Sequence, residues 1–342
     1  MMKFGSQLVL GAGALFALAV GAVVIATSER PPMESVQRGY RGTGMDQIYN
    51  PRFLAKTREA NVVPVSMPKL PDVGPKAGQV YKNVQVLKDQ SVGNFTRLMA
   101  SMTNWVSPVQ GCAYCHDVND MASDKLYTKV VSRRMLQMVQ HINADWKTHV
   151  VGTGVTCYTC HRGQPVPQNI WFKDPGPLQA KGYAQAPNGR NHPSTIAGYT
   201  ALANDPFTPF LEEAKDVRVA ATAALPGTTN TSIKQTYWTY ALMFHLSGAL
   251  GVNCTYCHDT RSFGDWSGST PQRVTAWYGI RMARDLNVNY MDPMQDVFPP
   301  ARLGPLGDAP KINCATCHQG VYKPLFGAQM AKDFPELQKV SQ

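Results

Sequence analysis

The most apolar stretch of the chain lies at its start. Residues 8–27 carry no charge, Lys3 precedes them, and Glu29-Arg30 follows directly. A helix of this length matches the hydrocarbon thickness of a bilayer. Val24-Ile25-Ala26 resembles a signal-peptide cleavage site, but the apolar core of a signal is usually shorter. We therefore favour a retained membrane anchor over a cleaved signal, with the remainder of the chain exported.

Further along, apolar residues recur at helical spacing in four segments. The pattern predicts helices over residues 95–106, 126–146, 237–250 and 271–286. Pro108 follows the first of these and Pro271 opens the last, as expected at helix ends. The connections are rich in Pro and Gly, with a short helix predicted near residues 209–215. The exported part is thus predicted to be mainly α, with long irregular connections.

Residues 29–90 lack this periodicity and read as an extended segment that wraps over the rest of the protein. Two valine-rich pieces in it, residues 62–65 and 84–87, predict edge strands. The chain is accordingly divided into 1–28 (anchor or signal segment), 29–90 (wrapping segment), 91–163 (first half), 164–235 (connecting segment) and 236–342 (second half and tail).

The pattern Cys-x-x-Cys-His occurs four times and uses all eight cysteines. The copies are Cys112–Cys115–His116, Cys157–Cys160–His161, Cys254–Cys257–His258 and Cys314–Cys317–His318. This pattern is typical of c-type haem attachment, in which two thiols bond to the porphyrin and the histidine binds iron. Zinc does not explain a histidine after every second cysteine, and a redox dithiol needs no histidine. We predict four covalent haems.

Composition agrees with a core that is partly porphyrin. Only 16% of the 342 residues are charged, while Gly (28) and Pro (25) are plentiful. The formal net charge of +10 would ordinarily suggest an anionic partner. Two propionates on each haem would add roughly eight negative charges and nearly cancel this excess. We therefore predict no nucleic-acid binding.

Each iron needs a second axial ligand. Outside the motifs lie four histidines (His141, His149, His192 and His245) and fifteen methionines. A helix that runs into a motif would place a methionine about three turns before the first cysteine. Met99 precedes Cys112 by thirteen residues, and Met243 precedes Cys254 by eleven. Met102 is the rival of Met99.

The order helix, motif, helix, motif occurs twice, which indicates an internal duplication of helix–motif pairs. Arg134-Met135 on the second predicted helix corresponds to Arg281-Met282 on the fourth. By spacing, Met135 suits the second motif. The repeat favours Met282 for the fourth, with His149 as the next choice.

Several longer stretches resemble the tetrahaem cytochrome c subunit of the photosynthetic reaction centre of purple-type bacteria, over about residues 75–340. They are residues 105–108, 133–136, 149–156, 205–208, 269–273, 279–282 and 319–328. The resemblance implies Met99, Met135 and Met243 as ligands of the first three haems and His149 as ligand of the fourth. It overrules the repeat-based choice, so Met282 is expected to be a core residue.

The resemblance also implies an order of electron flow. The third haem would lie nearest the membrane and the bacteriochlorophyll special pair of the reaction-centre core subunits, and the first haem furthest away. Arg273 is similar to an arginine whose charge would raise the potential of the third haem. Members of this family are often held by lipid on an N-terminal cysteine, which this sequence lacks. That departure favours a retained helix in the cell inner membrane.

We therefore expect an electron carrier, not an enzyme, with its haem domain on the periplasmic side. Its donor would be a soluble periplasmic c-type cytochrome or high-potential iron–sulfur protein. Asp117, Asp120 and Asp124 could attract a basic donor or could form a solvated loop. The alternative is a membrane-anchored multihaem cytochrome of an anaerobic respiratory or reductase pathway, which would need a five-coordinate iron. We expect His141 and His245 to make packing or propionate contacts and His192 to face solvent.

Overall fold

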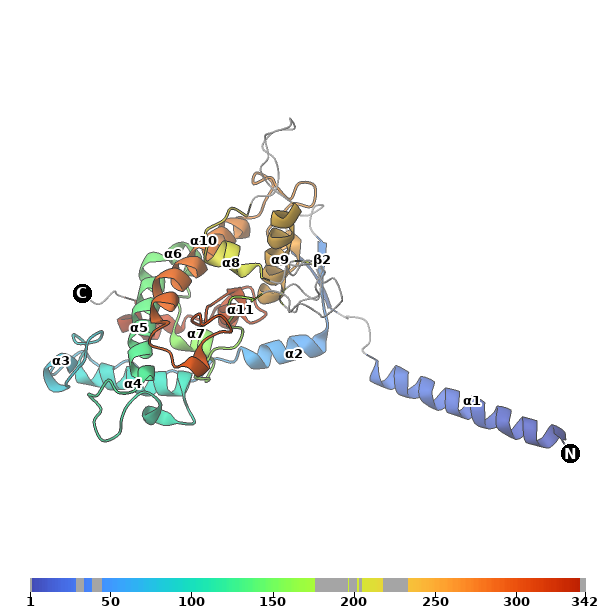
Figure 1. Ribbon diagram of the computed structural model, residues 1–342, viewed down its shortest axis with the longest axis horizontal. Coiled ribbons are helices and arrows are strands. Elements are labelled where there is room, and N and C mark those ends of the chain that lie inside the picture. Colours follow the sequence, from blue (N-terminus) through green and yellow to red (C-terminus); the bar gives the residue numbers. More distant parts are fainter. Residues whose placement is uncertain are drawn as a thin grey trace.

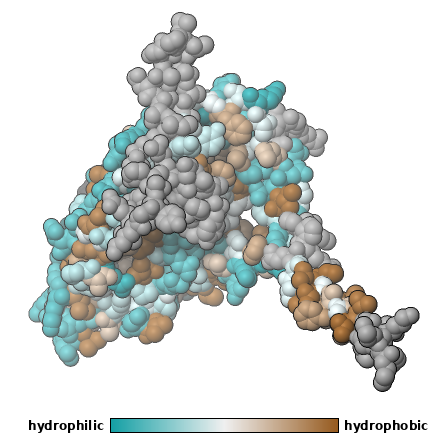
Figure 2. Space-filling view, turned by 45° about the vertical axis from the view of Figure 1, so that its right-hand side comes forward, coloured by the Kyte–Doolittle hydropathy of each residue, from teal (hydrophilic) through white to brown (hydrophobic). Residues whose placement is uncertain are grey.

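A single long helix and a mainly helical body make up the protein (Figure 1). The computed structural model describes residues 2–28, 34–38, 45–175, 196, 202, 205–217 and 233–338. Helix α1 (Met2–Thr27) projects away from the body, and none of its Val9–Thr27 window is buried. In Figure 2 apolar side chains cover this helix. Because an apolar helix so fully exposed has no protein partner to cover it, α1 is suited to a membrane anchor.

The four predicted long helices are confirmed. They are α4 (Val92–Val106), α5 (Tyr127–Asp145), α9 (Ile233–Leu250) and α10 (Pro271–Leu286). The side chain of Ser91 accepts a hydrogen bond from the backbone N–H of Asn94 and so caps the start of α4. Pro271 occupies the first turn of α10, where its missing N–H has no helical partner to lose. The short helix of the connecting segment is α8 (Phe207–Leu211), slightly earlier than predicted.

The two predicted edge strands are wrong. Residues 62–65 and 84–87 form no strand, and Pro64 lacks the N–H that a ladder needs. Val86 and Leu87 are buried in the main core from an irregular turn, so their apolar character reflects packing.

The ordered structure of the wrapping segment lies elsewhere. Strands β1 (Glu34–Arg38) and β2 (Met45–Tyr49) pair antiparallel, with Glu34 opposite Tyr49. Helix α2 (Pro51–Ala60) follows, and α3 (Ala77–Val80) comes later. Asn50 caps α2 and Pro51 opens it, a helix start signal that the sequence analysis overlooked.

Short helical turns carry most of the remaining connections. They are η1 (Gly111–Tyr114), α6 (Lys147–Val150), α7 (Cys157–His161), η3 (Cys254–Tyr256), η4 (Asn287–Met291), η5 (Asp292–Met294), η6 (Pro300–Arg302), α11 (Cys314–His318), η7 (Pro324–Gly327), η8 (Met330–Asp333) and η9 (Pro335–Leu337). All four haem motifs lie in such a turn or extend just beyond it, and each follows one of the four long helices.

Two apolar clusters hold the body together. The larger joins α4, α5 and the C-terminal segment through residues such as Leu98, Leu136 and Phe334. The smaller joins α8, α9 and α10 through Phe207, Leu242 and Ile280. Each cluster therefore combines two helices that precede haem motifs with a segment distant in the sequence.

A buried ion pair fastens the C-terminal segment to α4. The Arg97 guanidinium lies 2.9 Å from the Glu336 carboxylate, and both side chains are almost fully buried (3% and 2% exposed). Arg97 also donates to the carbonyl of Asp333 and lies 4.2 Å over the Phe334 ring. On α5, Gln140 donates to the carbonyl of Glu336 at 3.0 Å. The turns η8 and η9 thus contact both α4 and α5 and hold these two helices together.

We expect Glu336→Gln to lower the apparent free energy of unfolding by about 3 kcal/mol, because it leaves the Arg97 charge buried without its partner. Chemical denaturation of the haem-loaded subunit measures this change. The control is Glu213→Gln in the exposed pair Lys215–Glu213, with an expected change under about 0.5 kcal/mol. Equal midpoints for both variants would contradict the assigned role of the buried pair.

Candidate haem-binding site

The four Cys-x-x-Cys-His motifs fold in two ways. The second and fourth are single α-turns, α7 and α11, each with a capping box: Thr156 with Thr159, and Asn313 with Thr316. The first and third contain 3₁₀ turns, η1 and η3. In both forms the histidine ends the turn or directly follows it, on the same short stretch as its two cysteines.

All four motif histidines share one hydrogen bond. Nδ1 donates to a backbone carbonyl a few residues further on: His116 to Met121 (3.1 Å), His161 to Gln164 (2.8 Å), His258 to Phe263 (2.9 Å) and His318 to Val321 (3.0 Å). With its proton on Nδ1, a neutral imidazole presents the lone pair of Nε2, the form that binds a metal. Burial lowers the pKa of His161, and burial together with His149 lowers that of His318 to about 4, which favours the neutral form. The four rings are therefore in the tautomer in which Nε2 can bind iron.

A cavity of about 1360 Å³ runs between three of the motifs. Its lining includes both cysteines and the histidine of the first, second and fourth motifs. The candidate ligands Met99, Met135 and His149 line it as well, and so do the rivals Met102 and Met282. The cavity walls are mostly apolar, and they bring motif and candidate ligand side chains to one space, as bound porphyrins would require.

Of the third motif only Tyr256 lines this cavity; its two cysteines and its histidine do not. Its candidate ligand Met243 is partly buried and packs against the smaller apolar cluster on α9. Cys254 is exposed and Cys257 half-buried. The structure therefore places the third site beside α9, at the edge of the cavity that the other three motifs share.

His149 faces the histidine of the fourth motif. The ring centres of His149 and His318 are 6.1 Å apart. Metal–imidazole bonds of about 2 Å would put two rings on opposite sides of one metal about 6 Å apart, centre to centre. Nδ1 of His149 lies 2.9 Å from the carbonyl of Thr275, so its Nε2 is also left for a metal. The pair therefore fits a single iron between the two rings.

Gly279 makes room for His149. A Cβ at residue 279 would lie 2.5 Å from Cε1 of the His149 ring, closer than real Cβ atoms approach. Both Gly279 and Thr275 belong to α10, in the other half of the chain. The sequence analysis gave neither a role in the site. An isolated glycine inside a strongly helical pattern was the signal available for Gly279.

Met282 lies one turn beyond Gly279 and packs against the larger apolar cluster. Met99 and Met135 pack against the same cluster, so this packing does not distinguish Met282 from the candidate ligands. The contact between His149 and His318 favours His149 as the fourth distal ligand over Met282.

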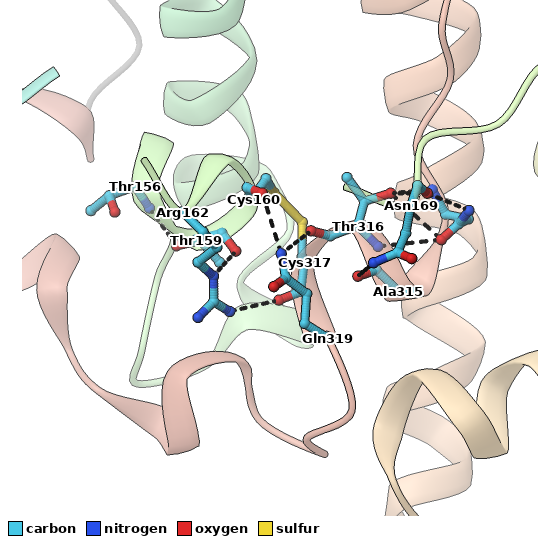
Figure 3. The surroundings of a disulfide bond; sticks show 10 residues. Thr156, Thr159, Cys160, Arg162, Asn169, Ala315, Thr316, Cys317 and Gln319 are labelled. Atoms are coloured by element: carbon cyan, nitrogen blue, oxygen red, sulfur yellow. Dashed lines mark hydrogen bonds between the residues drawn. A yellow bond between two sulfur atoms is a disulfide. The ribbon is translucent and has the colours of Figure 1, made fainter. Parts of the chain in front are cut away.

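The second and fourth motifs are in direct contact (Figure 3). Cys160 and Cys317 are joined as a disulfide, and the other six cysteines are free. Arg162 donates to the carbonyl of Cys317 at 3.2 Å, and Gln319 donates to that of Cys160 at 3.4 Å. A sulfur in a disulfide has no bond left for a thioether, so haem attachment at these motifs requires Cys160 and Cys317 as free thiols.

The remaining histidines have different surroundings. Both ring nitrogens of His141 are engaged, by Asp145 at 2.7 Å and Asp285 at 2.6 Å, so neither is left for iron. His245 is buried with its ring 4.6 Å from that of Phe207, and burial lowers its pKa to about 4. His192 lies outside the described residues. His141 thus bridges two carboxylates, whereas His245 packs against Phe207 and its buried Nε2 has no hydrogen-bond partner within the part of the chain that the structure describes.

The acidic residues after the first motif mostly serve the local fold. Asp124 is paired with Arg133 at 2.7 Å, which holds the pKa of its carboxyl well below the usual range. Asp117 and Asp120 accept hydrogen bonds from nearby backbone N–H groups. Their arrangement favours a solvated loop over a docking charge for a basic donor.

Helical packing around four haem-type motifs, with histidines prepared for a metal, defines a multihaem c-type cytochrome. A model of the family described as "Photosynthetic reaction centre cytochrome C subunit" matches residues 29–338. The chain belongs to this family. Its function is accordingly electron transfer to a photosynthetic reaction centre, with covalent c-type haem as cofactor and the membrane as its location.

Relatives named "Photosynthetic reaction center cytochrome c subunit" are similar over most of their length. The protein of Rubrivivax gelatinosus is 56% identical over 317 residues, covering 92% of this chain and 86% of the relative. That of Thermochromatium tepidum is 52% identical over 324 residues (95% and 80%). That of Roseobacter denitrificans is 39% identical over 350 residues (98% and 93%).

We expect Gly279→Ala to displace the His149 ring, because the added methyl group occupies its place. The fourth haem should lose the electron paramagnetic resonance signal of a bis-histidine iron while the other three sites keep theirs. Gly248→Ala on α9 is the control, since no atom lies within 4 Å of its added Cβ. An unchanged bis-histidine signal in Gly279→Ala would show that His149 is not held there.

Proposed function

We propose that this chain carries four covalent haems through which electrons pass from a soluble periplasmic donor to the photo-oxidised special pair. The observation that carries the proposal is the shared Nδ1 hydrogen bond of His149 and the four motif histidines, which leaves five Nε2 atoms for iron. Family membership supplies the partner, since the chain is similar throughout to reaction-centre cytochrome subunits.

In this proposal every iron has two protein ligands. The pairs are His116 with Met99, His161 with Met135, His258 with Met243, and His318 with His149. The eight motif cysteines supply the thioether bonds. Because no iron keeps an open position for a substrate, the protein acts as a carrier and not as an enzyme. The haem, when bound, supplies the one-electron chemistry, and the chain fixes ligand identity, spacing and nearby charge.

Ligand identity would divide the four sites by potential. Methionine–histidine ligation gives a higher potential than bis-histidine ligation. Three haems then have a high reduction potential, and the fourth haem, with His149 and His318 as ligands, has a low one. At the third site a positive charge would raise the potential further, and Arg273 is near enough to contribute to the lowered pKa of His258.

The contacts of strand β2 (Met45–Tyr49) support the proposed order of electron transfer. The Met45 N–H of β2 donates to Thr255 of the third motif at 2.9 Å, and Asn253 donates to the Met45 carbonyl at 2.9 Å. Tyr49 donates to the carbonyl of Gly251 at 3.1 Å. Strand β2, which follows the apolar helix in the chain, is thus attached beside the third motif. Helix α4 and the first motif lie on the opposite side of the body (Figure 1).

Electrons would therefore enter at the first haem and leave from the third, toward the membrane. We propose that α1 is retained as the anchor, which places the haem domain on the periplasmic side. The donor would be a small c-type cytochrome or a high-potential iron–sulfur protein.

We expect Met243→His to lower the potential of one high-potential haem, since imidazole replaces the thioether on the iron. At an ambient potential where this haem is reduced in the wild type but oxidised in the variant, flash-induced re-reduction of the special pair should slow. The control is Met282→Leu, which changes a core methionine and should leave all four potentials in place. If Met243→His alters neither the potential nor the re-reduction rate, Met243 is not the ligand.

The proposed partner is tested by isolating the protein from photosynthetic membranes with mild detergent. We expect it to purify with bacteriochlorophyll, and a flash should oxidise its haems within the isolated complex. Purification without pigment, together with a high-spin iron that takes up cyanide, would instead support the respiratory or reductase alternative.

A further inference from the structure

The loop between the third motif and α10 closes around the guanidinium group of Arg273. Nη1 donates to the carbonyl of Asp265 at 2.5 Å and to Oγ of Ser269 at 2.6 Å. Nη2 donates to the carbonyl of Gly264 at 3.4 Å. The guanidinium carbon lies 4.1 Å over the ring of Trp266. We call residues 264–269 the arginine cage.

The cage binds the guanidinium without a carboxylate. Among the described residues, no acidic side chain lies within ion-pair distance of Arg273. The carboxylate of Asp265 instead accepts from the N–H and the hydroxyl of Ser267, at 2.9 and 2.8 Å. Carbonyl dipoles and an aromatic face hold the cation, and the nearest carboxylate, Asp265, interacts with it beyond ion-pair distance. The charge of Arg273 is therefore offset only in part, and the remainder of its field acts on its surroundings.

The same loop holds the axial histidine of the third motif. Phe263, directly before the cage, accepts from Nδ1 of His258 at 2.9 Å, and the two rings lie 5.4 Å apart. After the cage, the N–H of Thr270 donates to the carbonyl of Cys257 at 3.3 Å. One loop therefore fixes both the ligand and the cation, so their separation is set by the loop.

Trp266 is the only cage residue that covers the face of the guanidinium. Trp266 is half exposed (49%), so its ring contributes little buried surface to the core. Its ring instead limits the positions that a long, flexible arginine side chain can take at the surface. Without the ring, the hydrogen bonds of Arg273 lie open to water and the cation can turn away from the third motif.

We propose that Trp266 is a positioning residue that raises the potential of the third haem by holding the positive charge of Arg273 beside it. This rests on the proposed assignment of the third haem to Cys254, Cys257 and His258. A fixed cation disfavours the ferric iron relative to the ferrous iron, so it raises the midpoint potential.

The test is an equilibrium redox titration of the intact complex, with the four haems resolved by their absorption bands. We expect Arg273→Gln to lower the midpoint potential of the third haem and Trp266→Leu to lower the same potential by a smaller amount. Trp266→Phe keeps an aromatic face and should retain most of the wild-type value. In the double variant the potential should equal that of Arg273→Gln alone, because Trp266 acts through Arg273.

A matched control lies about two turns further along α10, where Arg281 lies over the ring of Trp277. Trp277→Leu removes a similar stacked pair outside the cage and should leave the third haem unchanged. Should Trp266→Leu not assemble, Ser269→Ala removes one cage hydrogen bond and should give a small downward shift.

Three results would overturn the proposal. Trp266→Leu could leave the potential unchanged, Trp277→Leu could lower it as much, or Trp266→Leu could lower it equally in the Arg273→Gln background. The last would mean that Trp266 acts by excluding water. These outcomes are separate from failure of the proposed function, which would appear in the wild-type complex as haems that a flash does not oxidise.

Discussion

The hydrogen bond from histidine Nδ1 to a backbone carbonyl is the interaction on which the haem sites depend. It sets the tautomer, aims Nε2, and stops the ring from turning about its own bond. In the motifs the acceptor is three or five residues further along the chain, so each ligand is oriented by its own turn. For His149 the acceptor is Thr275 on a different helix, so this candidate ligand is oriented only when α6 and α10 are packed together.

This dependence explains how the two halves of the chain are joined at the centre of the molecule. His149 comes from the first half and faces His318 in the second. The reciprocal hydrogen bonds of Arg162 and Gln319 cross the same boundary. A haem bound there would therefore be held by both halves, whereas the third site draws its candidate ligands from one half alone.

Paired local geometry supports the duplication predicted from the sequence. The second and fourth motifs share α-turns with capping boxes. In the first and third, Thr128 and Thr270 donate to the carbonyls of Tyr114 and Tyr256, each at 2.5 Å. The repeat does not extend to the proposed distal ligands. Met282 corresponds to Met135 and packs against the same cluster, but the residue that lies opposite His318 is His149, from the other half of the chain.

The sequence was a good guide where the signal is local. Helical periodicity and flanking prolines located α4 and α10, and the haem motifs needed only their own five residues. It was a poor guide where buried apolar residues lie in an irregular segment. Val86 and Leu87 are an example, because their apolar run was interpreted as a strand. Contacts between distant segments, such as Gly279 against His149 or Trp266 against Arg273, leave no periodic pattern to detect. The repeat favoured Met282 with His149 as the next choice, and the family resemblance reversed that order.

The central claim is that all four irons are saturated by protein ligands, one of them by two histidines from opposite halves of the chain. Near-infrared magnetic circular dichroism of the fully oxidised wild-type complex tests it most directly, because the band position distinguishes methionine–histidine from bis-histidine iron. We predict four low-spin irons, three of the first kind and one of the second. A high-spin iron, or four irons with methionine–histidine ligation, would contradict the account.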